Sequence, residues 1–251
     1  MKSLPLSAKA YIFAVSTAGL IILSSGVYLA ESRDPVRFTI FLALALLCST
    51  FKVSLPGITG TMSANFLFIL VGILDFSFSE TLAIGCVATT FQCAWKAKKR
   101  PRPIQLVFSV TSMAVAIGAA YKLHHVLLAT HWMPHPIIAL AVTSSAFFLL
   151  NTMMVATVIV LAENKSFWPL WQECYFWAFP YYLLGAAIAA LLTTFTRQLG
   201  WYSSFLGLPI IYIIYRSYNF YLARLEDAKS HSAQMAQRTR ERSLTGRPVR
   251  L

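Results

Sequence analysis

Charged residues are scarce in this chain, and acidic ones are the scarcest. Only 12% of the 251 residues are charged, with 9 Asp and Glu against 21 Lys and Arg. A soluble domain of this length usually carries about twice that charged fraction, so an ordinary water-soluble domain is disfavoured. The net charge of +12 does not indicate nucleic-acid binding. The basic residues gather in one loop and in the tail, as at the cytoplasmic flanks of membrane helices.

The chain also lacks the motifs of common enzymes and metal sites. It has no phosphate-binding glycine loop, no HExxH or CxxC motif and no nucleophile elbow. The few cysteines stand singly in or beside apolar stretches, without metal or disulfide spacing, and we interpret them as small core hydrophobes. They are Cys48, Cys86, Cys93 and Cys174. We therefore expect no enzyme activity, no cofactor and no metal site.

What the chain does have is about eight long apolar stretches between Ala10 and Tyr221. A helix needs about 20 residues to cross a bilayer, so the second, third and fourth are short. We expect this middle block to be tilted, re-entrant or packed inside the bundle. The predicted spans are 10–30, 36–51, 62–78, 80–95, 104–123, 136–161, 175–195 and 202–221. The first is too long for the apolar part of a signal peptide, and we predict that it is not cleaved.

The predicted fold class is an all-α polytopic membrane bundle with a cytoplasmic C-terminal helix. We expect a bundle over residues 1–215, a juxtamembrane helix over 216–243 and a disordered tail over 244–251. The basic cluster Lys96–Arg102 indicates a cytoplasmic loop, and counting spans in both directions places both termini in the cytoplasm. The predicted external segments are 31–37, 77–79, 124–135 and 196–201. The predicted location is a bacterial inner membrane.

Proline and glycine mark two irregular places in the apolar region. The stretch Ser54–Thr61 is a predicted turn or extended loop between spans two and three, and such backbone is tolerated at membrane depth only inside protein or beside a cavity. Pro180 lies inside the seventh predicted span and is expected to kink it. Small residues around Gly118 and Gly185 are expected to let helices approach closely.

Polar residues inside the spans are the first candidates for a binding site. Asp75 and Glu80 flank a short external turn. Both are expected to be hydrated, with Glu80 capping the next helix; the alternative is an acidic rim that selects a cation or polar ligand. Asn65 and Asn151 are expected to form hydrogen bonds between helices, and the alternative is contact with a ligand.

Four histidines cluster in the predicted external segment between spans five and six. They are His124, His125, His131 and His135. No acidic residue or cysteine accompanies them, so we predict solvated or interfacial side chains rather than a metal site.

Aromatic residues crowd the stretch Phe167–Tyr182. Trp and Tyr favour the headgroup zone, so an interfacial belt explains most of them. That belt does not require Glu173, which is expected to pair with Lys165 or an arginine of the tail. The alternative is a coupling joint between the bundle and the last helix, with Glu173 and Pro180 as candidate coupling residues.

The last span continues into the tail without a helix breaker until Gly246. Apolar or small residues recur there at steps of three and four, as in the seam of a two-helix coiled coil. Tyr218 and Leu225 are the candidate coupling residues of this seam, which predicts a homodimer. A basic helix lying on anionic headgroups of the lipid bilayer is the alternative.

Five stretches of the chain together resemble the MASE type of bacterial N-terminal membrane sensor module. They are Lys52–Thr61, Gln92–Pro103, Glu173–Tyr182, Tyr215–Tyr218 and Tyr221–Glu226. The resemblance covers about residues 36–235. It implies a multi-span sensor whose last helix drives an HD-GYP or GGDEF domain of cyclic-di-GMP signalling. That output domain is absent here, so the resemblance implies a truncated or stand-alone sensor, or one that acts on a separate cytoplasmic signalling partner.

A looser likeness points to a different function. Span two, the Leu55-Pro56-Gly57 loop and spans three and four are similar to the substrate-capture subunits of energy-coupling-factor transporters, in which a similar loop covers a small-molecule pocket. Because the resemblance to MASE-type modules covers more of the chain, a membrane sensor or receptor module is the leading functional expectation. A small-molecule binding or uptake subunit is the alternative.

Overall fold

The computed structural model describes residues 4–28, 34–50, 52–54, 61–63, 65–95, 102–130 and 135–200, with single positions beyond them. Those positions are 209, 212, 213, 216, 217, 220, 224 and 235. The chain forms two compact units, Met1–Leu208 and Pro209–Leu251. The first unit ends at Leu208, whereas the predicted bundle extends to residue 215.

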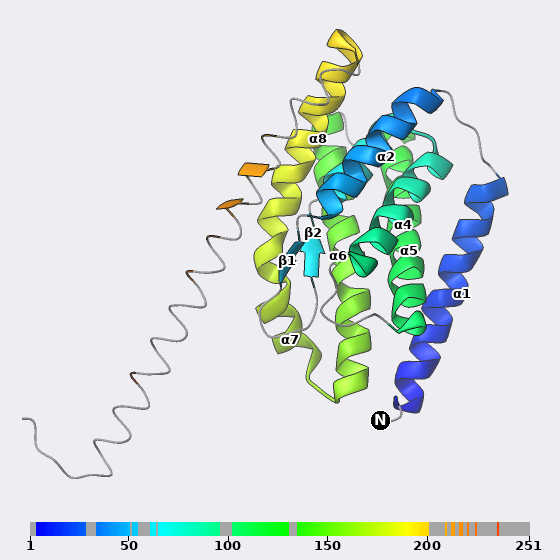
Figure 1. Cartoon of the computed structure of the whole chain (residues 1–251), viewed down its shortest axis with the longest axis vertical. Helices are drawn as coiled ribbons and strands as arrows, with labels where there is room; N and C mark the ends of the chain where they lie inside the picture. Colours follow the sequence, from blue (N-terminus) through cyan, green and yellow to red (C-terminus); the bar gives the residue numbers. More distant parts are fainter. Residues whose placement is uncertain are drawn as a thin grey trace, which may run out of the picture. The chain divides into compact units, whose positions relative to one another are not determined.

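Helices make up nearly all of the described part of the first unit (Figure 1). They are α1 (Leu6–Tyr28), α2 (Pro35–Ser49), α3 (Phe66–Asp75), α4 (Phe78–Ala94), α5 (Pro103–Ala129), α6 (Pro136–Glu163), α7 (Phe167–Cys174), the 3-10 turn η1 (Phe176–Ala178) and α8 (Phe179–Leu199). Two short strands, β1 (Lys52–Ser54) and β2 (Thr61–Ser63), form an antiparallel pair in which Val53 faces Met62. The all-α prediction therefore holds except for this small hairpin.

Four of the described helices are long and apolar enough to cross a membrane: α1, α5, α6 and α8. This is compatible with a multi-pass membrane protein. The expectation of a short middle block is confirmed, because α2 has 15 residues, α3 has 10 and α4 has 17. The predicted eighth span, residues 202–221, lies almost entirely outside the described residues, so the number of spans stays a prediction.

Three predictions about the helices are wrong: the start of span three, a kink at Pro180 and the end of span five. Span three was expected from residue 62, but residues 61–63 form β2 and α3 begins only at Phe66. Pro180 does not kink a helix: it occupies the first turn of α8, where the missing N–H has no helical partner to lose. Helix α5 continues to Ala129, so His124 lies within it rather than in a loop.

The helices pack around α5 and α3. Helix α5 contacts α1, α4 and α6, whereas α8 contacts α3 and α6, and α2 lies on α4. Seven consecutive residues of α3, from Leu67 to Ile73, are buried. A helix that is apolar on all sides belongs inside a bundle, and α3 therefore forms part of the core.

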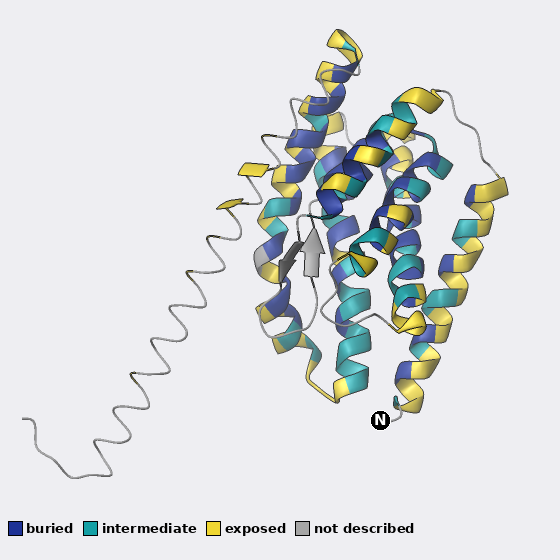
Figure 2. Ribbon diagram, viewed as in Figure 1, coloured by how far each residue is buried: buried dark blue, intermediate teal, exposed yellow. Residues whose placement is uncertain are grey.

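The outer surface of the long helices is apolar. Along α1, Phe13 is 74% exposed and Ile21 is 63% exposed, and exposed residues recur over its length (Figure 2). Large apolar side chains repeated on an outward face match a helix that contacts lipid tails.

Glycines allow the closest helix contacts, as the small-residue stretches predicted. Gly185 of α8 faces the ring of Phe66, and Gly118 of α5 faces Ile22 of α1. At Gly19 of α1 an added methyl group would collide with backbone and Cβ atoms of Thr111 in α5. The crossing of α1 and α5 therefore depends on the absence of a side chain at Gly19.

We predict that Gly19→Ala lowers the thermal stability of the purified protein in detergent, by about 1–3 kcal/mol, because backbone atoms cannot yield to the new methyl group. Gly26→Ala on the same helix is the matched control. Its methyl group would lie 2.6 Å from Leu82 Cδ1, the end of a flexible side chain. Equal melting temperatures for the two variants would contradict close α1–α5 packing.

Candidate functional site

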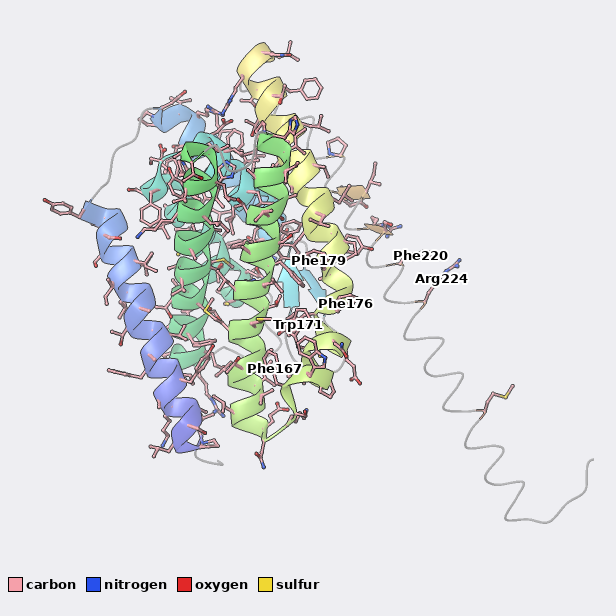
Figure 3. The ribbon with its side chains drawn as sticks, turned by 180° about the vertical axis from the view of Figure 1, so that it is seen from behind. Phe167, Trp171, Phe176, Phe179, Phe220 and Arg224 are labelled. Carbon is pink, nitrogen blue, oxygen red and sulfur yellow. The ribbon has the colours of Figure 1, made fainter. Side chains whose placement is uncertain are left out.

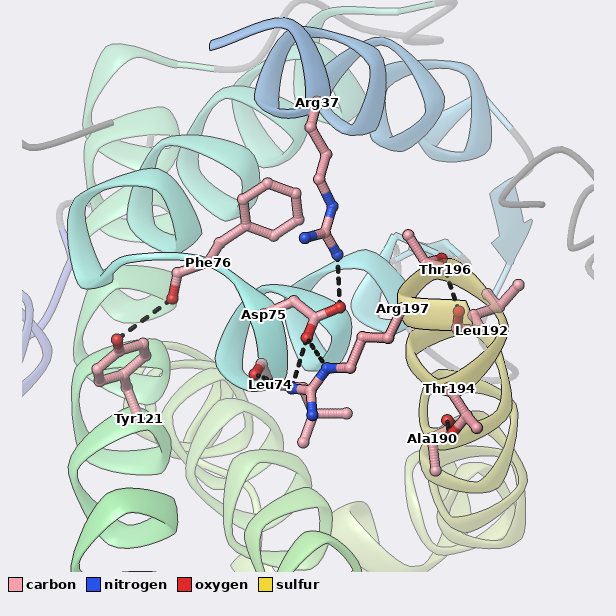
Figure 4. Close-up of polar contacts among 10 residues, drawn as sticks. All are labelled: Arg37, Leu74, Asp75, Phe76, Tyr121, Ala190, Leu192, Thr194, Thr196 and Arg197. Carbon is pink, nitrogen blue, oxygen red and sulfur yellow. Dashed lines mark hydrogen bonds and ion pairs between the residues drawn. The ribbon is translucent and has the colours of Figure 1, made fainter. Parts of the chain in front are cut away.

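A buried carboxylate joins three helices at one end of the bundle (Figure 4). The Asp75 side chain, at the last residue of α3, is only 3% exposed. Arg37 of α2 donates from Nη2 to Asp75 Oδ2 at 2.5 Å. Arg197 of α8 donates to Oδ1 from Nε at 3.0 Å and from Nη2 at 2.7 Å. We call these three residues the Asp75 cluster.

Local sequence positions both arginines at helix ends. Asp34 caps α2 by accepting a hydrogen bond from Arg37 N at 3.0 Å, and Pro35 starts the helix. Arg197 lies in the last turn of α8, where a cation complements the helix dipole. The first turn of α2 and the last turns of α3 and α8 therefore meet.

Electrostatics explains why two cations are needed. A carboxylate at a helix C-terminus faces the negative end of the helix dipole, and burial adds a desolvation cost. Arg197 offsets both effects, because its Nη2 also donates to the carbonyl of Leu74 at 3.3 Å. The cluster keeps one net positive charge, since two guanidinium groups face one carboxylate.

Aromatic rings hold the guanidinium group of Arg37 in place. Its Cζ lies 5.0 Å from the ring centroid of Phe76 and 5.7 Å from that of Phe41. These are cation–π distances. Arg37 is consequently more enclosed than Arg197: their side chains are 22% and 63% exposed.

The expectation that Asp75 is hydrated is wrong, because its carboxylate is enclosed by two arginines. The capping role of Glu80 is confirmed: Ser77 N donates to Glu80 Oε2 at 2.9 Å, and the Ser77 hydroxyl accepts from Glu80 N. Glu80 is itself only 7% exposed, so it is not hydrated either. A cation-selecting acidic rim loses its basis at Asp75, where both oxygens are occupied by guanidinium groups.

Asn65 lies at the opposite end of α3 from the Asp75 cluster. It is 5% exposed, and its Nδ2 has no hydrogen-bond partner among the described residues. It directly precedes α3 but its side chain does not cap the helix. The expected interhelical hydrogen bond of this amide is therefore absent from the described structure. Asn151 is half-buried on α6 and stays a candidate without a defined role.

Backbone N–H groups next to Asn65 also lack acceptors among the described residues. Its carbonyl accepts from both Phe68 N at 3.0 Å and Ile69 N at 3.3 Å. The first N–H groups of a helix have no intrahelical partner, and those of Phe66 and Leu67 have no acceptor among the described residues. Two backbone donors and the Asn65 amide nitrogen, all at the start of α3, thus have no acceptor among the described residues.

The start of α3 lies deep in the bundle. Ten helical residues span about 15 Å, half the thickness of a bilayer core, and their far end is the Asp75 cluster. The ring of Phe66 stacks on Tyr182 of α8 at 4.4 Å between centroids, about four turns before Arg197. The hairpin that precedes α3 lies near mid-height of the bundle in Figure 1.

A wall of aromatic rings adjoins the start of α3. Tyr182 contacts Phe148 of α6 at 4.9 Å and Phe147 at 6.1 Å between ring centroids. The hydroxyl of Ser144 donates to the Tyr182 carbonyl at 2.9 Å and ties α6 to α8 at this level. The donors of α3 therefore lie beside a packed, apolar and aromatic region.

The described histidines of this group, His124, His125 and His135, do not form a common site. His124 is 3% exposed, and its Nδ1 lies 3.2 Å from the hydroxyl of Thr143 on α6. The expectation of a solvated or interfacial side chain is wrong for His124, because α5 extends past it. His125 stacks on Tyr121, His135 precedes α6, and His131 lies outside the described residues. No group of three metal-binding side chains occurs in the described part of the chain.

The aromatic stretch is partly anchored in the bundle (Figure 3). Trp171 of α7 donates from Nε1 to the Thr152 hydroxyl of α6 at 3.1 Å, and its ring lies 6.1 Å from that of Phe148. Trp168 and Phe176 are exposed, as in an interfacial belt.

Of the two expected partners of Glu173, Lys165 pairs with another residue, and most arginines of the tail lie outside the described residues. Lys165 pairs with Glu163 at 2.6 Å, and this contact raises the pKa of Lys165. Glu173 and Pro180 are both exposed. Tyr218 and Leu225 lie outside the described residues, although in the second unit the Arg224 guanidinium lies 4.6 Å from the Phe220 ring centroid.

Arg37 and Arg197 were not among the residues selected from sequence. A usable signal was present, because both lie in segments predicted to be external, and Asp75 flanks a third such segment. The structure confirms that these three positions share one end of the bundle. The sequence does not show that the ends of α2, α3 and α8 are close enough for ion pairs.

No protein-family model, curated protein or solved structure matches this chain. The fold and the site thus define the class as a helical bundle whose described part contains four long apolar helices, compatible with a multi-pass membrane protein.

We predict that Asp75→Asn destabilises the protein by about 3 kcal/mol, because it leaves Arg37 without its counter-charge in an enclosed position. Arg37→Gln should cost nearly as much, whereas Arg197→Gln should cost about 1 kcal/mol or less, since that side chain is largely exposed. Thermal unfolding in detergent measures all three. Glu163→Gln, which breaks the exposed pair with Lys165, is the control and should change stability little. A melting temperature of Asp75→Asn equal to that of this control would contradict the role of the cluster.

Proposed function

We propose that this protein is a bacterial inner-membrane sensor module that passes a ligand- or membrane-induced shift of its bundle to its C-terminal segment. The observation that carries the proposal is the Asp75 cluster. Asp75 connects α3, a short buried helix, to Arg197 on α8, the last long helix before the C-terminal unit. A displacement of α3 would therefore be transmitted to α8 through an ion pair rather than through apolar contact alone.

The geometry supports such coupling because α3 is held differently at its two ends. At its C-terminal end Asp75 accepts three hydrogen bonds from two arginines. At its N-terminal end, the amide nitrogen of the Asn65 side chain and the first N–H groups have no partners among the described residues. An occupant that interacts differently with two positions of α3 shifts the equilibrium between them.

The proposed output follows from the resemblance to MASE-type modules. The segment 216–243 would form a cytoplasmic dimeric helix, and both chain termini would lie in the cytoplasm. A separate cyclic-di-GMP signalling protein would then receive the change. The basic composition of this segment supports a place beside anionic headgroups of the inner leaflet.

Cysteine cross-linking in native membranes tests the dimer and the coupling together. The background is the full chain with its four cysteines replaced by alanine. We predict that Leu225→Cys forms a cross-linked dimer, because it lies on the heptad seam, and that Ala223→Cys, on the opposite side of that helix, does not.

Adding Asp75→Asn or Arg197→Gln should change the fraction of Leu225→Cys that cross-links. A coupling free energy of about 1 kcal/mol corresponds to about a fivefold change in the dimer equilibrium. Glu163→Gln is the control and should leave the fraction unchanged. Equal cross-linking at positions 223 and 225 would contradict the seam, and no effect of either cluster variant would contradict the coupling.

A small-molecule capture subunit is the second candidate function. It is favoured by the hairpin and the half-length α3, because interrupted helices at membrane depth commonly line substrate sites. Co-purification with a transporter ATPase would support this function over a sensor. Cross-linking at Leu225 that responds to Asp75→Asn would support the sensor.

A further inference from the structure

The start of α3 presents hydrogen-bond donors without acceptors. The Asn65 amide nitrogen is buried and unpaired, and it lies at the same end as the N–H groups of Phe66 and Leu67. Buried donors are almost always paired in folded proteins, so an unpaired one calls for an explanation. A ligand that supplies the missing acceptor is one such explanation.

The charge of this end of the helix selects the kind of acceptor. The N-terminus of a helix carries a partial positive charge and attracts anions. The helix itself supplies no carboxylate there: the first turn of α3 contains no acidic residue, and Asp75 lies at the opposite end of the helix. The site therefore favours an anionic oxygen over a neutral one.

Packing around the donors selects the rest of the ligand. Phe66 stacks on Tyr182, and the ring of Tyr182 meets that of Phe148. Gly185 leaves room for the Phe66 ring, because any side chain at that position would collide with it. A ligand at the donors would thus have an aromatic and apolar wall beside its charged group.

We propose that the N-terminal end of α3, with Asn65 as its side-chain donor, binds the carboxylate of a small aromatic or apolar acid. The carboxylate oxygens accept hydrogen bonds from Asn65 Nδ2 and from the N–H groups of Phe66 and Leu67. The apolar part of the acid lies toward Tyr182 and Phe148. Half-helix N-termini near the middle of a membrane bind anionic groups of substrates in the same way.

The position of the site links it to the Asp75 cluster. A ligand at Asn65 acts on one end of α3, and the cluster holds the other end about 15 Å away. The effect of ligand binding on the C-terminal segment rests on the proposed function, whereas ligand binding itself does not. Binding itself is measured at the Asn65 amide of the full-length protein and does not depend on any response of the C-terminal segment, so failure of one proposal is distinguishable from failure of the other.

Selective labelling of asparagine with nitrogen-15 gives a direct test. The chain has only four asparagines, Asn65, Asn151, Asn164 and Asn219, so the side-chain amide spectrum of the full-length protein in detergent is simple. The signal that Asn65→Leu removes identifies Asn65. We predict that benzoate shifts this signal saturably, while the signal of Asn151 does not move and serves as the internal control.

Two comparisons separate carboxylate binding from other effects. Benzyl alcohol, which keeps the ring but lacks the charge, should bind at least about tenfold more weakly than benzoate. Asn65→Asp replaces the amide donor by a carboxylate, which has the same negative charge as benzoate. The affinity for benzoate, measured by calorimetry, should then fall about tenfold or more. An unchanged Asn151 signal shows that a variant is folded. If Asn65→Asp does not fold, Asn65→Ser is used, and the shorter side chain should weaken binding in the same direction.

The result that overturns the proposal is an Asn65 signal that does not respond to millimolar benzoate, as expected if a water molecule alone satisfies the amide. Equal responses to benzoate and benzyl alcohol would also overturn it, because binding would then be apolar only. So would equal benzoate affinities for the wild-type chain and the Asn65 variants.

Discussion

One buried carboxylate constrains the arrangement of half of this bundle. Asp75 ends a helix that is apolar on every side, and an unpaired charge in that position would cost several kcal/mol. It is tolerated only because α2 begins, and α8 ends, at the same level, each with an arginine. The N-terminal start of α2 and the C-terminal end of α8 are therefore held at one end of α3.

The short length of α3 follows from this arrangement. It reaches about 15 Å from the Asp75 cluster and then gives way to a hairpin instead of continuing as a full span. A helix that starts inside a bundle exposes its first N–H groups to protein rather than water. The same shortness that packs α3 into the core therefore creates the unpaired donors around Asn65.

The two ends of α3 would act together, one in binding a ligand and the other in passing a shift to α8. The Asn65 end offers donors for an anionic ligand, and the Asp75 end is bound to α8 by hydrogen bonds. A rigid helix between a binding site and an ion pair would transmit small shifts, because packed cores change between discrete arrangements rather than deform continuously. This picture applies to a sensor and equally to a capture subunit; they differ in what α8 acts on.

The sequence by itself determined the class, because hydropathy and span length depend on local composition. It also indicated the short middle block, the irregular stretch after span two, the capping role of Glu80 and the placement of segments 31–37, 77–79 and 196–201 on the same side. Only the tertiary structure decided that the three residues of the Asp75 cluster lie in contact, that Asn65 is enclosed without a partner, that Pro180 starts a helix and that His124 is buried. Burial and pairing depend on which helices become neighbours, and that is a property of packing between residues far apart in the chain, which no local pattern contains.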